Sequence, residues 1–390
     1  MTFAQLALIC LVALSGPLLA LGRSFRVPVV IGELLVGIVL GHTGFQVLSA
    51  SNPTFSFLGE VGFALVMFVA GTHVPVRSPA LRAGLRVGVG RALGVGVVAV
   101  AVGWGVASVF GTGHGLLYAV LLASSSASIV LPALEGVPLT GRSMVEMLPQ
   151  LALADAACIV LLPLVIDPAN APRAALGALI VGVGALVFWW ILRWAERSGR
   201  RRAVHEVSEE RGLAIELRSV LVALFGMAAI AQSMHVSIML AGFATGLAVA
   251  GVGEPRRVAH QVFALTEGLF APIFFVWLGS SLDLRQLISH PGAVVLGLVL
   301  GLTAVGVHAL GALTGQPWPV AVSTAAQLGV PVAAATLGTS LHLLGPGEPT
   351  ALLLGALVTI AVVTVVSGKV AALARTEAPA PAPPSTAPRS

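Results

Sequence analysis

Long apolar runs separated by short loops dominate this sequence and limit what it can fold into. A helix needs about 20 apolar residues to cross the hydrocarbon core of a bilayer. The chain of 390 residues is 57% hydrophobic and only 9% charged, which is too little polar surface for a soluble globule. We therefore predict an all-α polytopic membrane protein with about 13 transmembrane helices, at 4–21, 27–46, 55–73, 88–110, 114–136, 144–166, 174–194, 213–231, 235–252, 264–282, 292–313, 317–343 and 349–371.

Charge and motif content exclude several other classes of protein. The formal net charge of +5 does not indicate nucleic-acid binding, because the 21 basic residues are spread over loops and form no single face. No nucleotide-binding fingerprint occurs, so we expect neither a cofactor nor an ATP-driven pump. The GxSxG and HExxH motifs of hydrolases are also missing, so we do not expect an enzyme.

The basic residues are distributed unevenly over the loops between the predicted spans. All but two of them, Arg173 and Arg285, fall on alternate connections. Because cytoplasmic loops are enriched in Lys and Arg, this pattern predicts a cell-membrane protein with its N-terminus outside and its C-terminus in the cytoplasm. We expect one transmembrane domain over 1–372 with a charged cytoplasmic linker at 195–212. A Pro- and Ala-rich cytoplasmic tail over 373–390 is predicted to be disordered.

Asp155 is the most informative polar residue inside a predicted span. It lies midway along the sixth run, where the residues one helical turn away are uncharged. A carboxyl group at that depth is costly, so it marks an ion or proton site by default, although a protonated Asp bonding a neighbouring helix is the structural alternative. We interpret Asp155 as the group that binds a proton or a cation.

Two further spans carry clustered hydroxyl groups followed by a proline. The fifth run contains SSSASIVLP at 124–132, and the twelfth contains STAAQLGVP at 323–331, which matches it in kind almost position by position. Paired, proline-interrupted spans are typical of inverted-repeat transporters, whose broken helices converge near the membrane centre. A serine-rich packing seam is the alternative. The predicted supporting ion-site residues are Ser124, Ser125, Ser126, Ser128, Ser323, Thr324 and Gln327.

His308 lies at the centre of the eleventh predicted span. A histidine there is either a satisfied core residue or a group that changes charge near neutral pH. We treat it as a candidate charge partner of Asp155 or a pH sensor.

Four segments in order resemble the monovalent cation:proton antiporter-2 family, with its sodium/hydrogen exchanger-like membrane domain. They are VPVVIGELLVGIVLGHTGF at 27–45, LGEVGFALVMFVAGTHV at 58–74, LLASSSASIVLPAL at 121–134 and FAPIFFVWLGSSLDL at 270–284. The resemblance implies an inverted-repeat antiporter fold with two discontinuous helices crossing near the membrane centre. It also implies a homodimer and an essential aspartate, which Asp155 matches.

The chain departs from the family pattern at several places. Ala154 stands where members usually carry a polar residue before the aspartate, and His308 stands where electrogenic members carry a lysine. The nucleotide-binding regulatory domain of potassium-efflux members is not present in this sequence. Ion identity, Na⁺ or K⁺, and stoichiometry therefore stay open.

These observations predict a secondary antiporter that exchanges protons for a monovalent cation by alternating access. With one membrane-centre carboxylate, electroneutral exchange is the simplest stoichiometry. The other expected partner of the protein is membrane lipid. The alternatives are an organic-anion symporter on the same scaffold and a channel-like or non-transporting membrane protein.

Overall fold

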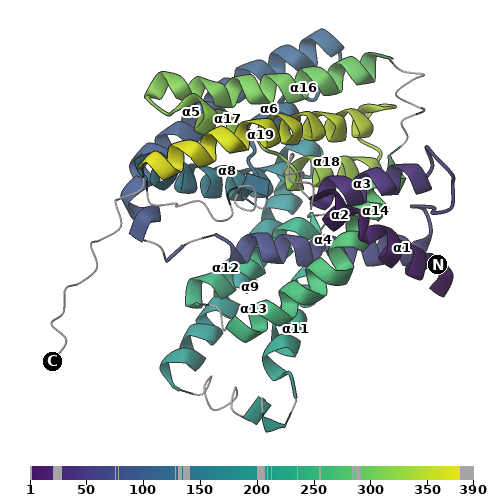
Figure 1. Cartoon of the computed structure of the whole chain (residues 1–390), viewed down its shortest axis with the longest axis vertical. Helices are drawn as coiled ribbons and strands as arrows, with labels where there is room; N and C mark the ends of the chain where they lie inside the picture. Colours follow the sequence, from purple (N-terminus) through teal and green to yellow (C-terminus); the bar gives the residue numbers. More distant parts are fainter. Residues whose placement is uncertain are drawn as a thin grey trace.

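A computed structural model places the chain in two helical bundles that pack on each other (Figure 1). The structure describes residues 2–20, 29–74, 76–77, 79–127, 129–130, 134, 141–199, 207–208, 210–211, 213–234, 236–253, 256–282, 285 and 291–377. These residues contain no strand, which agrees with the predicted all-α class.

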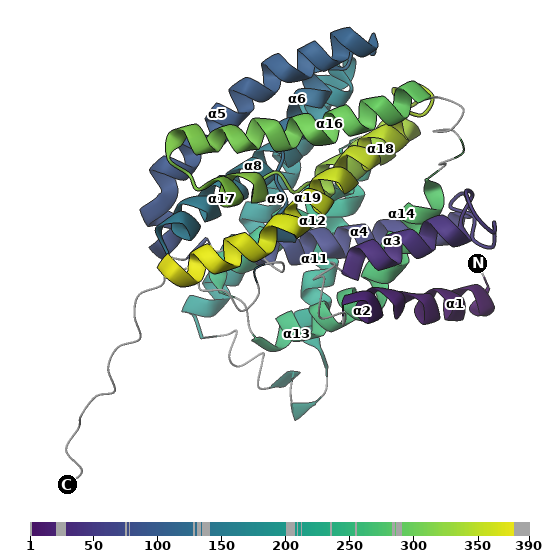
Figure 2. The same ribbon diagram turned by 45° about the horizontal axis from the view of Figure 1, so that its top comes forward.

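The scaffold bundle, as we name it, contains the N-terminal helices and those of the middle of the chain. They are α1 (Phe3–Ala13), α2 (Ser15–Ala20), α3 (Val29–Leu40), α4 (Pro53–Thr72), α11 (Ile215–Ser233), α12 (Ile238–Val252), α13 (Arg256–Leu265), the π-helical turn η2 (Thr266–Phe270) and α14 (Ala271–Ser281). Helix α4 packs on α12 and α14, and α14 packs on α3. In Figure 2 most of these helices lie below the other bundle.

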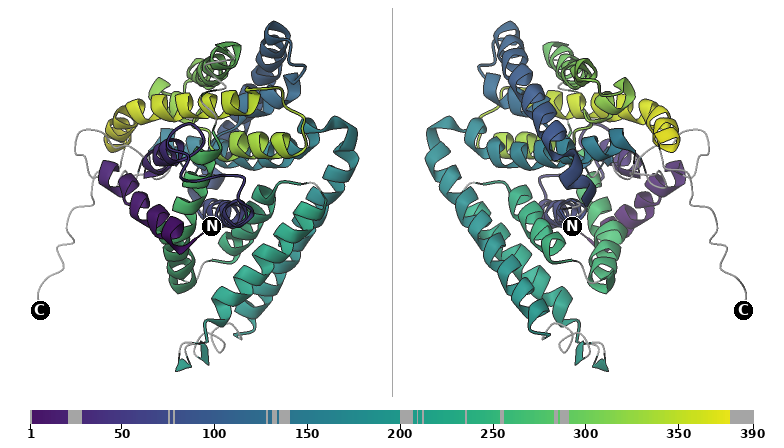
Figure 3. Two further views of the ribbon diagram at one scale, coloured as in Figure 1. Left: turned by 90° about the vertical axis from the view of Figure 1, so that its right-hand side faces the viewer. Right: turned by 90° about the vertical axis from the view of Figure 1, so that its left-hand side faces the viewer.

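The core bundle contains the predicted site residues. It is formed by α5 (Pro79–Phe110), α6 (Gly115–Ala123), α8 (Arg142–Ile166), α16 (Pro291–Ala309), the 3-10 turn η3 (Leu310–Thr314), α17 (Trp318–Ser323), α18 (Gly329–Ser340) and α19 (Glu348–Glu377). Helix α5 packs on α6 and α8, and α16 packs on α19. After the short 3-10 turn η1 (Pro168–Asn170), α9 (Ala171–Arg197) contacts α8 of the core and α11 and α12 of the scaffold. Figure 3 shows α9 and α11 side by side along one edge of the molecule.

Local sequence signals explain where several helices begin. The Asn52 side chain accepts a hydrogen bond from the Phe55 amide at 3.2 Å, and Pro53 occupies the first turn of α4, where its missing N–H costs nothing. Ser237 caps α12 in the same way, through the Met239 amide at 3.2 Å.

Glycines allow close helix contacts in the scaffold bundle. A Cβ at Gly246 of α12 would overlap the Phe68 carbonyl of α4, and a Cβ at Gly37 would overlap the Val276 carbonyl of α14. Such close approach of backbones is a common way for helices to associate in lipid.

Eight helices in the described part of the chain are long and apolar enough to cross a membrane, with shorter apolar helices at Phe3–Leu18 and Ile238–Val252. The predicted number of thirteen is not reached by this criterion, because five predicted spans do not contain a described helix of 18 residues. The runs at 114–136 and 317–343 are interrupted, and the described helices in the runs at 4–21, 27–46 and 235–252 are shorter. Helix α19 continues to Glu377, so residues 373–377, expected to begin a disordered tail, are helical. Residues 378–390 and parts of the linker at 195–212 lie outside the described residues.

Candidate functional site: the crossing of two broken helices

The first predicted interruption is a real break in a helix. Helix α6 ends at Ala123, and Ser124 is extended, with φ −70° and ψ 149°. The backbone is non-helical through Ser126 and helical again at Ala127. The Ser124 hydroxyl donates back to the Leu121 carbonyl at 2.8 Å, so it stays with its own helix. All three serines 124–126 are buried, whereas Ser128 lies outside the described residues.

The second interruption, in the twelfth run, is also a break. Helix α17 ends at Ser323, and α18 begins only at Gly329. Between them Leu328 has φ −146° and ψ −64°, which no helix allows. Pro331 falls in the first turn of α18, where its missing N–H leaves no helical bond unmade.

The two breaks lie against each other, and together we call Leu121–Ala127 and Ser323–Leu328 the crossing. The Ser125 hydroxyl donates to the Thr324 carbonyl, and the Gln327 amide donates to the Leu121 carbonyl at 2.7 Å. The Thr324 carbonyl lies just past the end of α17, where the backbone leaves acceptors without helical partners. The Leu121 carbonyl, near the end of α6, also accepts the amide and the hydroxyl of Ser124. The structure therefore brings together residues about 200 positions apart in the sequence.

Asp155 lies on α8 beside the first break. Only 6% of its surface is exposed, and its Oδ2 accepts the backbone N–H of Ala127 at 3.4 Å. An amide where the chain resumes a helix favours negative charge on that oxygen. No ion pair to Asp155 occurs among the described residues.

His308 of α16 is 1% exposed and contacts the crossing. Its Nδ1 lies 2.9 Å from the Thr324 hydroxyl oxygen, and its Nε2 has no hydrogen-bond partner within the described chain. The structure places the ring against Thr324, and among the described residues no hydrogen bond or ion pair joins it to Asp155.

The remaining predicted residues also bond helices outside the crossing or their own helix. The backbone amide of Gln327 donates to the Thr359 hydroxyl of α19 at 3.2 Å. The Ser323 hydroxyl donates to the Val320 carbonyl of its own helix at 2.7 Å, and lies 3.7 Å from the Met147 sulfur. Of the predicted set, Asp155, Ser125, Thr324, Gln327 and His308 therefore make hydrogen bonds between helices or breaks, and Ser323 lies beside the Met147 sulfur of α8.

Two buried glutamines were missed by sequence reasoning. The Gln150 amide of α8 donates to the Thr324 hydroxyl at 3.4 Å and accepts from Gln316 at 3.0 Å. Both side chains are at most 2% exposed. An amide within an apolar run is the signal that could have identified Gln150.

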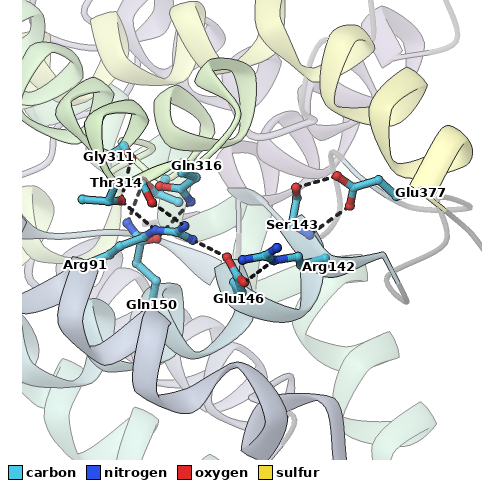
Figure 4. A network of polar contacts seen from close by, with 10 residues as sticks. Arg91, Arg142, Ser143, Glu146, Gln150, Gly311, Thr314, Gln316 and Glu377 are labelled. Atoms are coloured by element: carbon cyan, nitrogen blue, oxygen red, sulfur yellow. Dashed lines mark hydrogen bonds and ion pairs between the residues drawn. The ribbon is translucent and has the colours of Figure 1, made fainter.

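A charged network adjoins these glutamines at the end of the core bundle where α8 begins (Figure 4). Arg91 of α5 pairs with Glu146 at 2.8 Å and donates to the Thr314 hydroxyl at 2.9 Å. Exposed Arg142 also pairs with Glu146, at 2.9 Å. Nearby, Glu377 accepts the Ser143 amide at 2.9 Å and its hydroxyl at 2.6 Å, which ties the end of α19 to the start of α8.

The fold and the crossing define a membrane-embedded helical protein whose two interrupted helices meet beside a buried carboxyl group. Residues 10–374 match the family described as sodium/hydrogen exchanger, transmembrane. The chain belongs to that family. Its apolar helices and its family identify it as a multi-pass membrane protein.

Known proteins and a solved structure are similar to this chain. The glutathione-regulated potassium-efflux system protein KefC of Klebsiella pneumoniae is 26% identical over 299 residues, 71% of this chain and 44% of the relative. The putative Na⁺/H⁺ antiporter YjbQ of Bacillus subtilis is 20% identical, over 91% of this chain and 61% of the relative. A Na⁺/H⁺ antiporter of Enterococcus hirae is 25% identical over 76% of each chain.

This chain thus spans about half the length of the first two of these relatives. The sodium proton antiporter MjNhaP1 of Methanocaldococcus jannaschii has the same fold, with a TM-score of 0.64 at 17% identity. The likeness covers 95% of this chain and 98% of that one.

Proposed function

We propose that this protein is a secondary antiporter that exchanges protons for Na⁺ or K⁺. The observation that carries the proposal is the position of Asp155, a buried carboxyl group next to the break in α6. A proton and a cation compete for this one carboxylate, so the site is loaded with one or the other. The antiporter relatives named above support cation–proton exchange as the activity.

Oxygen atoms of the crossing complete the proposed cation site. Hydroxyl, amide and carbonyl oxygens suit a hard monovalent cation, and the buried Ser125, Ser126 and Thr324 offer them within the crossing. Gln327 holds the two broken helices together through Leu121. Its role is therefore to position the site.

Alternating access follows in our proposal from the division into two bundles. The core bundle carries the crossing and Asp155 and moves as a body against the scaffold bundle, as expected for an inverted-repeat transporter. Helix α9, which contacts both bundles, is one connection that has to accommodate the motion, together with the segments that join α4 to α5 and α14 to α16.

One carboxylate at the crossing supports electroneutral exchange of one proton for one cation. His308 is the group that would alter this stoichiometry by carrying a second proton, because it is a second titratable side chain at the crossing. The proposal further includes a homodimer in the cell membrane, with the N-terminus outside and the C-terminus in the cytoplasm.

Transport by Asp155→Asn in proteoliposomes tests this proposal. The change keeps the size of the side chain but removes the titrating group, so we expect no dissipation of a pH gradient on addition of Na⁺, K⁺ or other monovalent cations. Asp167→Asn is the matched control, since Asp167 follows the last residue of the same helix and bonds the exposed Asn170. Retained exchange by Asp155→Asn would refute the mechanism.

A further inference from the structure

A cavity of about 580 Å³ opens between α4 and α11 in the scaffold bundle, away from the crossing. It lies in the size range of small-molecule sites, and most of its wall is apolar. The residues that carry the argument are Phe57, Glu60, Phe225, Ala228, Gln232 and Phe270.

The cavity exists because two helix faces meet at one end only. Leu65 and Phe68 of α4 belong to a small core cluster with Val220 and Leu224 of α11. Further along, Phe57, Glu60, Val61 and Ala64 recur at helical spacing and face Leu221, Phe225, Ala228 and Gln232, which recur likewise. The alanines at 64, 228 and 229 leave the space unfilled, and Phe270 of the π turn also lines it.

Glu60 is the unusual member of this wall. It lies inside α4, a helix apolar enough to cross a membrane, and it is half-buried. No hydrogen bond or ion pair to its carboxyl group occurs among the described residues. A carboxylate among apolar side chains is costly unless a cation or a donor meets it.

The chemistry of the other lining residues fits a cation with apolar substituents. Phe57, Phe225 and Phe270 present aromatic rings to the cavity, and aromatic rings attract organic cations through their faces. Gln232 adds one amide at the rim. An uncharged acyl chain would fill the apolar part and leave Glu60 without a partner.

We propose that this cavity binds a lipophilic organic cation, with the positive charge at Glu60 and the apolar groups among the three phenylalanines. The site is separate from the cation site at Asp155, and the inference does not depend on antiport. Such a ligand would reach the cavity from the bilayer, since α4 and α11 both carry exposed apolar side chains next to it, at Phe57 and Val222.

Equilibrium binding of radiolabelled tetraphenylphosphonium to the full chain in nanodiscs of zwitterionic lipid tests the proposal, with empty discs subtracted. We expect saturable binding that uncharged tetraphenylsilane does not displace. Glu60→Gln removes the charge but keeps the shape, and it should weaken binding roughly tenfold or more. Ala228→Phe fills the cavity and should abolish binding.

Two control variants separate this site from others. Glu267→Gln changes an exposed carboxylate of the same bundle that does not line the cavity, and it should bind the cation within about twofold of the wild type. Asp155→Asn should also bind normally, which keeps this inference distinct from the transport mechanism. Loss of binding in Asp155→Asn would assign the cation to the crossing and overturn the proposal. Wild-type-like binding by both Glu60→Gln and Ala228→Phe would also overturn the proposal. So would an absence of saturable binding to the wild type, which is the result expected if a second copy covers the cavity.

Discussion

The two bundles use their buried polar groups in different ways. In the scaffold bundle, the hydroxyls of Thr245 and Ser280 donate to carbonyls of their own helices, at 2.6 and 2.8 Å. In the core bundle, the side chains of Ser125, Gln327 and Gln150 bond a different helix or break. The scaffold does have side-chain bonds between segments, from Trp277 to the Ala50 carbonyl and from Thr43 to the Leu282 carbonyl, but these accept at loops or helix ends. Close packing therefore dominates between the scaffold helices, whereas hydrogen bonds between helices hold the core helices around the crossing.

This difference fits the tasks that we propose for the bundles. A bilayer offers no water to buried polar groups, so bonds between helices are retained where the backbone is broken and its carbonyls need partners. The described scaffold helices have milder interruptions, at the turn of Leu14 between α1 and α2 and at the π turn η2. The scaffold can therefore be packed by glycines and apolar side chains, which place few demands on charge or hydration.

Gly246→Leu should disrupt the close contact between α12 and α4 in the scaffold bundle, and we expect it to have the largest effect on stability. A Cβ at this position already overlaps the Phe68 backbone carbonyl, which cannot rotate away. We expect a loss of stability of about 3 kcal/mol or more, seen as loss of the monodisperse peak in size-exclusion chromatography after extraction. Gly90→Leu is the control, because nothing lies within 4 Å of a Cβ there. If both variants kept or both lost the monodisperse peak, close helix packing at Gly246 would not be what stabilises the scaffold bundle.

Arg91→Gln tests how much the charged network of the core bundle contributes to stability. Arg91 and Arg142 pair with the same carboxylate, but their side chains are 5% and 87% exposed. Removing the buried partner should cost about 3 kcal/mol, whereas Arg142→Gln should cost less than about 1 kcal/mol. Denaturant unfolding in detergent micelles measures both. A larger effect at Arg142 would show that burial does not determine the strength of this pair.

The breaks at the crossing could be predicted because each carries a local signal. Clustered hydroxyls followed by Pro132 or Pro331 indicate interrupted helices, and the likeness of the two segments suggested that they belong together. The contact between Asp155 and the Ala127 amide follows from the same arrangement. The number of membrane-spanning helices was harder to predict from the sequence, because a broken helix and a continuous helix have similar apolar runs.

Contacts between distant polar residues left no signal in the sequence. Arg91 and Glu146 are separated by 55 positions, and nothing in either segment specifies the pair. Close packing of glycine pairs four positions apart cannot be predicted from the spacing either. Gly37 and Gly41 pack against α14, whereas nothing lies within 4 Å of a Cβ at Gly90 or Gly94. The spacing is identical, and only the fold decides which face meets a neighbour.

The smallest effect concerns His114, at the end of the core bundle where α6 and α19 begin. Its Nδ1 lies 2.7 Å from Oε1 of Glu348, which also accepts the Tyr118 hydroxyl at 2.6 Å. The hydrogen bond to Glu348 raises the pKa of His114 above its ordinary 6.5, and burial only partly opposes this. The folded protein therefore holds the proton to higher pH than the unfolded chain does. The contact stabilises fully below pH 6.5, and this contribution is lost as the pH rises through the raised pKa.

Thermal unfolding of the wild type and His114→Asn measures this contribution at pH 5.5, below the ordinary pKa of 6.5, and at pH 8.5, above it. We expect the variant to unfold at a lower temperature at the acidic pH, with a smaller difference at the basic pH. His342→Gln is the control, because His342 is an exposed histidine, and its difference from the wild type should not change in this way. A His114→Asn difference that is the same at both pH values would mean that the proton on His114 does not strengthen the contact with Glu348. The hydrogen bonds of the core bundle would then act through their geometry alone, as the glycine contacts of the scaffold do.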